Sequence, residues 1–188
     1  MITISSNFIG YFKLGDNICY NLECIRLLKN THNSDKATNR SLIKPLVIFI
    51  ASVAEAVLCD FYNRLRGFTS EGVDSVSDEV LAEVRAKHID EFAKYIDHAK
   101  KRKMLRGDET LYDDLHELRK LRNRVHIQNS KSHFEPDDSK AFTSARLLKA
   151  EKTLEQLLRI FEEDHCRKNK NAADCVAPFE LPWKSHLK

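Results

Sequence analysis

The chain has 188 residues, enough for one domain with a hydrophobic core and too few for two large ones. Charged residues make up 31%, whereas glycine (5) and proline (4) are scarce, which favours long solvated helices over a turn-rich β fold. The net charge of +3 is too small, by itself, to indicate a nucleic-acid-binding protein.

The five cysteines, at positions 19, 24, 59, 166 and 175, include no Cys-x-x-Cys pair. An odd number without zinc-like spacing indicates reduced thiols in a cytoplasmic protein. The first residues show no basic region followed by an apolar run, so we expect no secretory signal. We also expect no cofactor and no bound metal, because no glycine-rich phosphate loop or zinc motif is present.

The N-terminal region, residues 1–35, is predicted to be an arm followed by a short helix. Residues 1–16 carry β-branched and aromatic side chains and are expected to be strand-like or irregular. Apolar residues then recur at helical spacing over 17–30, which predicts a short amphipathic helix.

The first long helix is predicted over 36–66, and Pro45 either kinks it or marks its start. Apolar side chains surround most of this helix, so it is expected in the middle of a helical bundle. Its apolar run is interrupted by Glu55 and Asp60 and is too short to span a bilayer, so we expect no membrane contact.

A second helix is predicted over 76–105, with Ser75 or Ser77 as its N-cap and Gly107 as its C-terminal stop. The third helix is predicted over 109–128, opened by a capping box in the segment TLYD, which starts at Thr110.

The fourth helix is predicted over 138–165, since Pro136 and Asp137 or Asp138 are helix-start signals. The tail, 166–188, shows no periodicity and is expected to be irregular, with Phe179 and Trp183 as anchors.

The prediction is an all-α fold: an antiparallel four-helix up-and-down bundle over 36–165, with a short N-terminal helical addition and an irregular C-terminal tail.

The third helix carries the candidate site. If residues 111–126 form an ideal helix, its leucines and Val125 make a core stripe, and Arg119, Arg122 and His126 share one line along the edge of that stripe. Asn123 lies beside this line. The opposite side is expected to be solvated, and it carries Asp113, Glu117, Lys120 and Arg124.

These residue types suit the cleavage of RNA without a metal. Arginine offers a planar fork of donors for a phosphate, and histidine exchanges a proton near neutral pH. Attack by the 2′-hydroxyl needs a proton-transfer group and a cation near the developing charge. The structural alternative is that the arginine stems cover apolar surface and the histidine is a packed polar residue.

The segment RKLRNRVH resembles the Arg-x(4–6)-His signature of the HEPN superfamily (higher eukaryotes and prokaryotes nucleotide-binding domains). The resemblance includes the helical bundle and the apolar, Glu-containing first helix, and it covers about 36–165. Six residues separate Arg119 from His126 and only three separate Arg122 from it, so both arginines stay candidates for the motif arginine. Gln128 stands where many members of the superfamily have a tyrosine.

The resemblance implies a metal-independent endoribonuclease acting as a homodimer, with the two motifs facing each other across a shared cleft. It also implies a toxin–antitoxin or phage-defence setting, with an antitoxin or nucleotidyltransferase as partner. Some members of the superfamily are inactive, so the alternative is a non-catalytic module that binds a nucleotide or a protein. A helical DNA-binding protein is a third reading, but no helix-turn-helix is recognisable.

Other charged residues were weighed as functional. The end of the second helix is basic, and its cations either complement the helix dipole or track RNA phosphates; they are Lys100, Lys101, Arg102, Lys103 and Arg106. His88 and His98 are too far apart to act as metal ligands together and are expected on a solvated face. Glu55 lies among apolar neighbours and needs a partner, for which Arg119 or Arg122 is predicted.

Overall fold

The computed structural model describes residues 1–34, 39–68, 73–126, 137–167 and 176–187. Helices dominate these residues, so the predicted all-α class is confirmed. The elements in chain order are β1 (Ile2–Ile4), α1 (Phe12–Ser34), α2 (Asn39–Gly67), α3 (Asp78–Ala86), α4 (Phe92–Lys101), α5 (Glu109–Asn123), α6 (Asp138–Ala141), α7 (Ser144–Asp164) and β2 (Phe179–Leu181).

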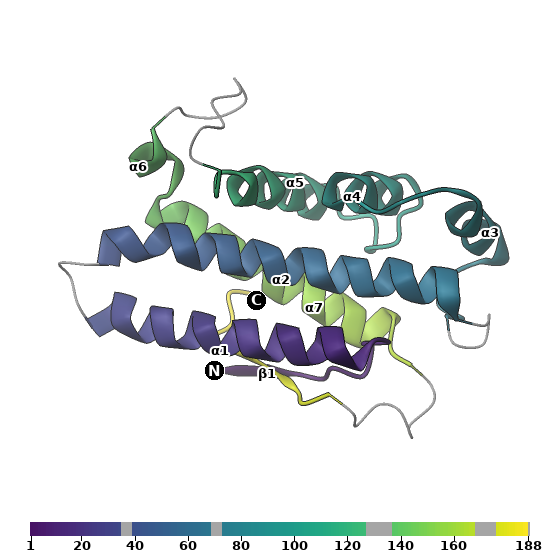
Figure 1. Ribbon diagram of the computed structural model, residues 1–188, viewed down its shortest axis with the longest axis horizontal. Helices are drawn as coiled ribbons and strands as arrows, with labels where there is room; N and C mark the ends of the chain where they lie inside the picture. The colour runs from purple at the N-terminus through teal and green to yellow at the C-terminus, as the bar shows by residue number, and fades with distance from the viewer. Residues whose placement is uncertain (35–38, 69–72, 127–136, 168–175, 188) are drawn as a thin grey trace.

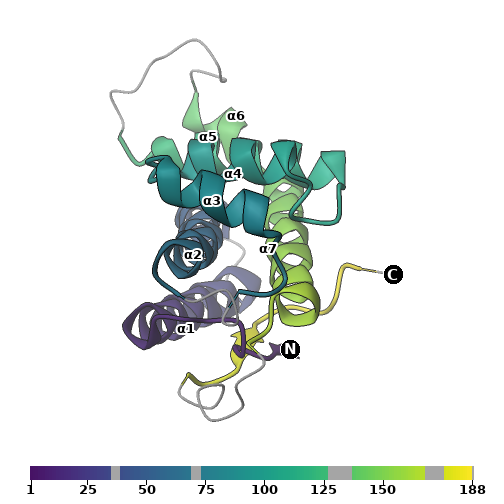
Figure 2. The same cartoon turned by 90° about the vertical axis from the view of Figure 1, so that its right-hand side faces the viewer.

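Helix α2 lies at the centre of the fold, as its all-round apolar pattern predicts. Helix α1 packs on one side of it and α4 and α5 on the other, while α7 crosses behind it (Figure 1). The view turned by 90° shows the same order of layers (Figure 2). Pro45 lies inside α2 and does not mark its start. By length and composition α2 is also a candidate membrane span, but its packing against α1, α3, α4, α5 and α7 is that of a core helix.

The N-terminal region differs from the prediction, because α1 is a full-length partner of α2. Its first turn lies in the part of residues 1–16 that was expected to be strand-like or irregular. The reason is Asp60 of α2, which is buried and whose carboxylate accepts hydrogen bonds of 2.9 Å from the backbone N–H groups of Gly10 and Tyr11. This long-range cap fixes where α1 begins.

The predicted second helix over 76–105 is wrong in two respects: it is divided into α3 and α4, and α4 ends at Lys101 with Arg102 as its C-cap, so Gly107 is not its C-terminal stop. The two are joined by 87–91, where Ile89 is buried and its carbonyl accepts a hydrogen bond from Arg66 of α2. No glycine or proline marks this break in the sequence, so only the contact with α2 explains it. Of the two predicted N-caps, Ser77 is the one that caps α3, and its Oγ accepts a hydrogen bond from the Val80 N–H.

Helix boundaries further along also differ from the predictions. Helix α5 begins after Asp108, whose side chain accepts from the Thr110 N–H, so the predicted capping box at Thr110 is wrong. The predicted helix over 138–165 is divided into α6, capped by Asp137, and α7, capped by Thr143. Aspartate and threonine oxygens in an extended N-cap position satisfy the free N–H groups of the first turn.

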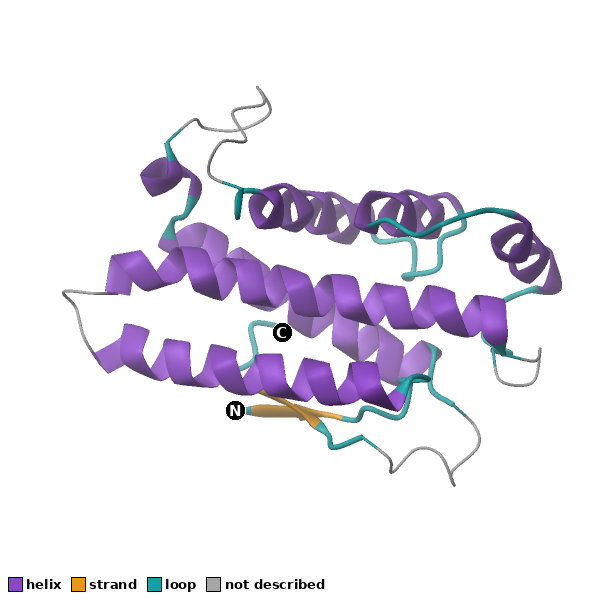
Figure 3. Cartoon of the chain, in the orientation of Figure 1, coloured by secondary structure: helices purple, strands orange, loops and turns teal. Residues whose placement is uncertain are grey.

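The C-terminal tail was predicted to be irregular, and this is wrong for 179–181, because β2 pairs with β1 in an antiparallel ribbon (Figure 3). Ile2 lies opposite Leu181 and Ile4 opposite Phe179. The predicted anchors are confirmed, since Phe179 and Trp183 are both buried. A strand of three residues carries little local signal, and it forms here because a distant strand supplies its hydrogen bonds.

Candidate functional site

The candidate site lies where α5 ends. The last helical residue is Asn123, and the chain turns at Arg124, so the predicted continuation of this helix to 128 is wrong over the described residues. His126 is exposed, and its backbone N–H donates to the Asn123 carbonyl at 3.4 Å. It therefore lies beyond the helical line that was expected to align it with Arg119 and Arg122. Gln128 lies outside the described residues.

Arg122 is held across the interface between α5 and α2. Its Nη2 group donates to the carboxylate of Glu55, and its Nη1 group lies 3.3 Å from Oδ1 of Asn123. The Glu55 side chain is 24% exposed and that of Arg122 is 36% exposed, so the pair is open to solvent on one side. Of the two partners predicted for Glu55, the structure selects Arg122.

Burial raises the pKa of the Glu55 carboxyl, and the charge of Arg122 opposes that shift without cancelling it. The carboxylate is therefore easier to protonate than an exposed glutamate. A guanidinium that shares its charge with a half-buried carboxylate keeps further N–H donors for a second anion, because it has five in all.

Arg119 lies one turn before Arg122 and is half-buried. Its Nε atom is inaccessible to solvent and has no hydrogen-bond partner among the residues that the structure describes. The structure thus places the two candidate arginines in different roles: Arg122 is fixed by a carboxylate, whereas the Nε of Arg119 is desolvated without a bond.

The side of α5 that was expected to be solvated is solvated only in part. Glu117 contacts Arg146 (3.2 Å) and Lys149 (2.7 Å) of α7, and Arg124 donates to Asp138 of α6 at 2.8 Å. The prediction of a solvated face is therefore wrong for Glu117 and Arg124. It assumed one buried stripe, whereas α5 packs against both α2 and α7. Asp113 and Lys120 are exposed, as predicted.

The basic stretch over 100–106, which begins in the last turn of α4, is largely offset by carboxylates. Lys100 contacts Glu109 and Asp113, Lys101 contacts Glu83, Arg102 contacts Glu79 and Glu83, and Arg106 contacts Glu163 and Asp164. Lys103 follows α4 in a left-handed conformation with φ of 53°. These partners leave less positive charge for RNA phosphates than the sequence alone indicates.

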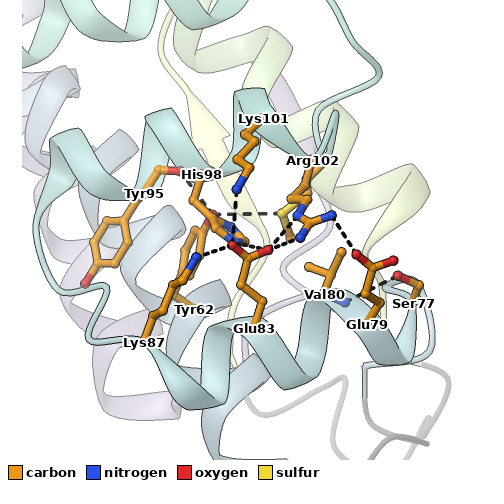
Figure 4. A network of polar contacts seen from close by, with 11 residues as sticks. Tyr62, Ser77, Glu79, Val80, Glu83, Lys87, Tyr95, His98, Lys101 and Arg102 are labelled. Carbon is orange, nitrogen blue, oxygen red and sulfur yellow. Dashed lines mark hydrogen bonds and ion pairs between the residues drawn. The ribbon is translucent and has the colours of Figure 1, made fainter.

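His98 is buried, so the prediction of a solvated face is wrong for it, while His88 is exposed as expected. The reason is the break between α3 and α4, which folds α3 over α4. Figure 4 shows Glu83 of α3 with Lys87, His98, Lys101 and Arg102 directed toward it. Arg102 donates to Glu83 at 2.6 Å, and this cationic setting lowers the pKa of the Glu83 carboxyl to about 2.

The imidazole of His98 connects this cluster to the core. Its Nδ1 lies 3.0 Å from the buried Tyr62 hydroxyl, whereas its Nε2 lies 3.6 Å from Glu83, beyond an ordinary hydrogen bond. Burial lowers the pKa of His98. Within the described ranges no group of three histidine, cysteine or carboxylate side chains is placed to hold a metal ion.

We compared the chain with models of protein families, with curated proteins and with solved structures, and no match was found in any of the three comparisons.

Proposed function

We propose that this protein is a HEPN-like, metal-independent endoribonuclease whose site is formed by Arg119, Arg122, Asn123 and His126 at the end of α5. The observation that carries the proposal is the Glu55–Arg122 ion pair, which joins the carboxylate of the apolar helix to an arginine of the motif. An arginine used only as a surface cation needs no partner on the central helix.

In this mechanism Arg122 binds the scissile phosphate through the donors that Glu55 leaves free. Glu55 and Asn123 fix the plane of the guanidinium, so its positive charge faces the developing phosphorane without reorganisation. Arg119 adds a second cation one turn away. This arrangement assigns Arg122 as the motif arginine and gives Arg119 a supporting role.

His126 transfers the proton. As it takes the proton of the 2′-hydroxyl, that oxygen bonds to phosphorus, the 5′-oxygen leaves with a proton, and a 2′,3′-cyclic phosphate remains. Its exposed position beyond the helix end gives the imidazole access to an RNA strand. One site holds one such histidine, so a homodimer that pairs two sites supplies both a base and an acid. The apolar Val125, 51% exposed beside His126, suits such a contact.

The test is RNA cleavage by the purified protein in EDTA, with analysis of product ends. Wild type is expected to leave 2′,3′-cyclic phosphates, and His126→Ala to lose at least about 100-fold of the rate. The matched control is His88→Ala, because His88 is also an exposed histidine but lies away from α5. A native mass near twice 21.8 kDa is expected for the dimer.

A second candidate function is a non-catalytic module that binds a nucleotide or a partner protein. It is favoured by the end of α5 at Asn123, which leaves His126 off the helical line of the arginines. A folded dimer that cleaves no RNA in the same assay would support this second function. Equal cleavage by wild type and His126→Ala would contradict the assignment of His126.

A further inference from the structure

His165, the C-cap residue that follows α7, has both ring nitrogens engaged. Its Nε2 lies 2.9 Å from the backbone carbonyl oxygen of Met104, and its Nδ1 lies 2.9 Å from the hydroxyl oxygen of Ser75. The ring packs against both Phe61 and Phe161, at centroid distances of 4.6 and 5.0 Å. Two hydrogen-bonding contacts and two ring contacts therefore fix its orientation.

These contacts determine the position of the proton on the imidazole. A carbonyl oxygen can only accept, so Nε2 must carry the hydrogen that is donated to Met104. In the neutral ring Nδ1 then has a free lone pair, and the Ser75 hydroxyl must donate to it. The serine proton is thus directed at an unprotonated imidazole nitrogen, which is the relation of a nucleophile to its general base.

The surroundings keep the ring neutral. Burial lowers the pKa of His165, and Arg64 of α2 and Arg106 of the turn after α4 add to that shift, while Asp164 of α7 and the Met104 carbonyl oppose it. His165 is 4% exposed, but Ser75 is exposed, so the hydroxyl is open to a reagent while its base is not.

Ser75 and His165 both line a cavity of about 290 Å³. The same cavity is lined by Lys103 and Arg106, two non-glycine residues with positive φ of 53° and 56°. Left-handed non-glycine residues are strained and cluster at functional sites. Here they flank Met104, so the strained turn carries the carbonyl that sets the tautomer of His165.

We propose that Ser75 is a nucleophile for small carboxylic esters that carry a negative charge, with His165 as its general base. The size of the cavity limits the acyl group, and its charges select an anion. Arg102 and Arg106 line it but are paired with carboxylates, whereas Lys103 lines it with no ion pair among the described residues and is the cation that selects an anion. The carbonyl of Met104 takes the place of the acid that orients the histidine in serine hydrolases. This site is separate from the RNA site proposed at the end of α5.

In the reaction Ser75 Oγ bonds to the ester carbonyl carbon while its proton passes to Nδ1 of His165. The tetrahedral intermediate then expels the alcohol oxygen, which takes that proton, and leaves acyl-Ser75. Water attacks the acyl carbon, gives a proton to Nδ1 and releases the carboxylic acid as Ser75 Oγ recovers the proton. The net reaction converts the ester and one water molecule into a carboxylic acid and an alcohol.

The experiment is labelling with diisopropyl fluorophosphate, which modifies activated serines with loss of fluoride, followed by mass spectrometry of the peptide that contains Ser75. Wild type is expected to be modified at Ser75, Ser75→Ala to lose the label, and His165→Gln to react about 100-fold more slowly. The matched control is Ser77→Ala, since Ser77 lines the same cavity without an imidazole beside it, and its labelling should equal that of wild type.

Two further measurements use wild type alone and do not depend on the folding of a variant. The labelling rate should fall as the pH drops through the pKa of His165, which burial holds below the ordinary histidine value. A p-nitrophenyl ester with a terminal carboxylate should be hydrolysed faster than its uncharged analogue. No modification of Ser75 in the folded protein, or a labelling rate unaffected by His165→Gln, would overturn the proposal. Retention of labelling in His126→Ala would keep this site distinct from the RNA site.

Discussion

Glu55 of α2 and Arg122 of α5 are 67 residues apart in sequence and form an ion pair that joins the two helices. Each side chain is partly exposed, so the pair bridges the core helix and the open end of α5. A carboxylate within an apolar stretch is costly to bury, and burial raises its pKa despite the arginine. A positioning role for Arg122 accounts for that cost.

Glu55→Gln is therefore expected to separate stability from activity. The loss of the ion pair is offset by the removal of a half-buried charge, so the free energy of unfolding should change by no more than about 1 kcal/mol. RNA cleavage should fall about 100-fold, because Arg122 loses the group that orients it. Urea unfolding and cleavage assays measure the two effects. Glu180→Gln, at an exposed glutamate of β2, is the control and should change neither.

The two arginines are distinguished by lysine substitutions. Lysine keeps the charge but not the fork, and the fork of Arg122 contacts both Glu55 and Asn123. Arg122→Lys should reduce cleavage at least about tenfold, with a smaller loss for Arg119→Lys. If Arg119→Lys has the larger effect, the motif arginine is Arg119, with its spacing of six residues to His126.

Asp60→Asn tests the long-range cap of α1. The buried carboxylate accepts two backbone N–H groups, and an amide can accept only on its oxygen, so one N–H loses its partner. We expect a loss of about 2 kcal/mol in the free energy of unfolding, measured by urea denaturation. Asp16→Asn, at an exposed aspartate of α1, should be near neutral. An equal effect of the two variants would contradict the capping role.

The buried histidines make stability dependent on pH. Burial lowers the pKa of His98 and of His165, so between the folded value and 6.5 the unfolded chain binds more protons than the native chain. The stability that they contribute is present above pH 6.5 and is lost as the pH falls below it. Thermal unfolding between pH 7.5 and 5 should show this decline. The variant His98→Asn/His165→Gln should show a flatter profile, although its absolute stability is lower.

The basic residues in the last turn of α4 are expected to contribute little to RNA affinity. Lys100 and Lys101 already contact Glu109, Asp113 and Glu83, so their binding to phosphates requires those contacts to break. For Lys100→Ala/Lys101→Ala the slope of log affinity against log salt should change by less than about one. A larger change would place the RNA along this stretch.

Helical periodicity was enough to predict the central helix, because apolar residues surround most of α2 and several helices pack against it. The sequence also predicted that Glu55 has an arginine as its partner, since a carboxylate among apolar residues needs an opposite charge. The choice between Arg119 and Arg122 was not, because it depends on the rotation of α5 against α2. The end of α5 at Asn123 was also missed, and that error moved His126 off its expected line.

Contacts distant in sequence decided the rest. The start of α1 depends on Asp60, and the break between α3 and α4 depends on Arg66, and neither residue is near the boundary that it sets. Ser75 and His165 were predicted only as residues at helix ends, although their side chains are in contact and lie 90 residues apart in sequence. The one local signal was Ser75 itself. Because Ser77 is the N-cap of α3, Ser75 has no capping role in that helix.

The pairing of β1 with β2 has a consequence for synthesis on the ribosome. The strand Ile2–Ile4 emerges before its partner Phe179–Leu181, which is made only after all the described helices. During that time the backbone donors and acceptors of β1 have no sheet partner, and the apolar Ile4 has no Phe179 opposite it. Closure of the ribbon is thus a late event, and a nascent chain stalled before β2 exposes an open strand edge to other chains.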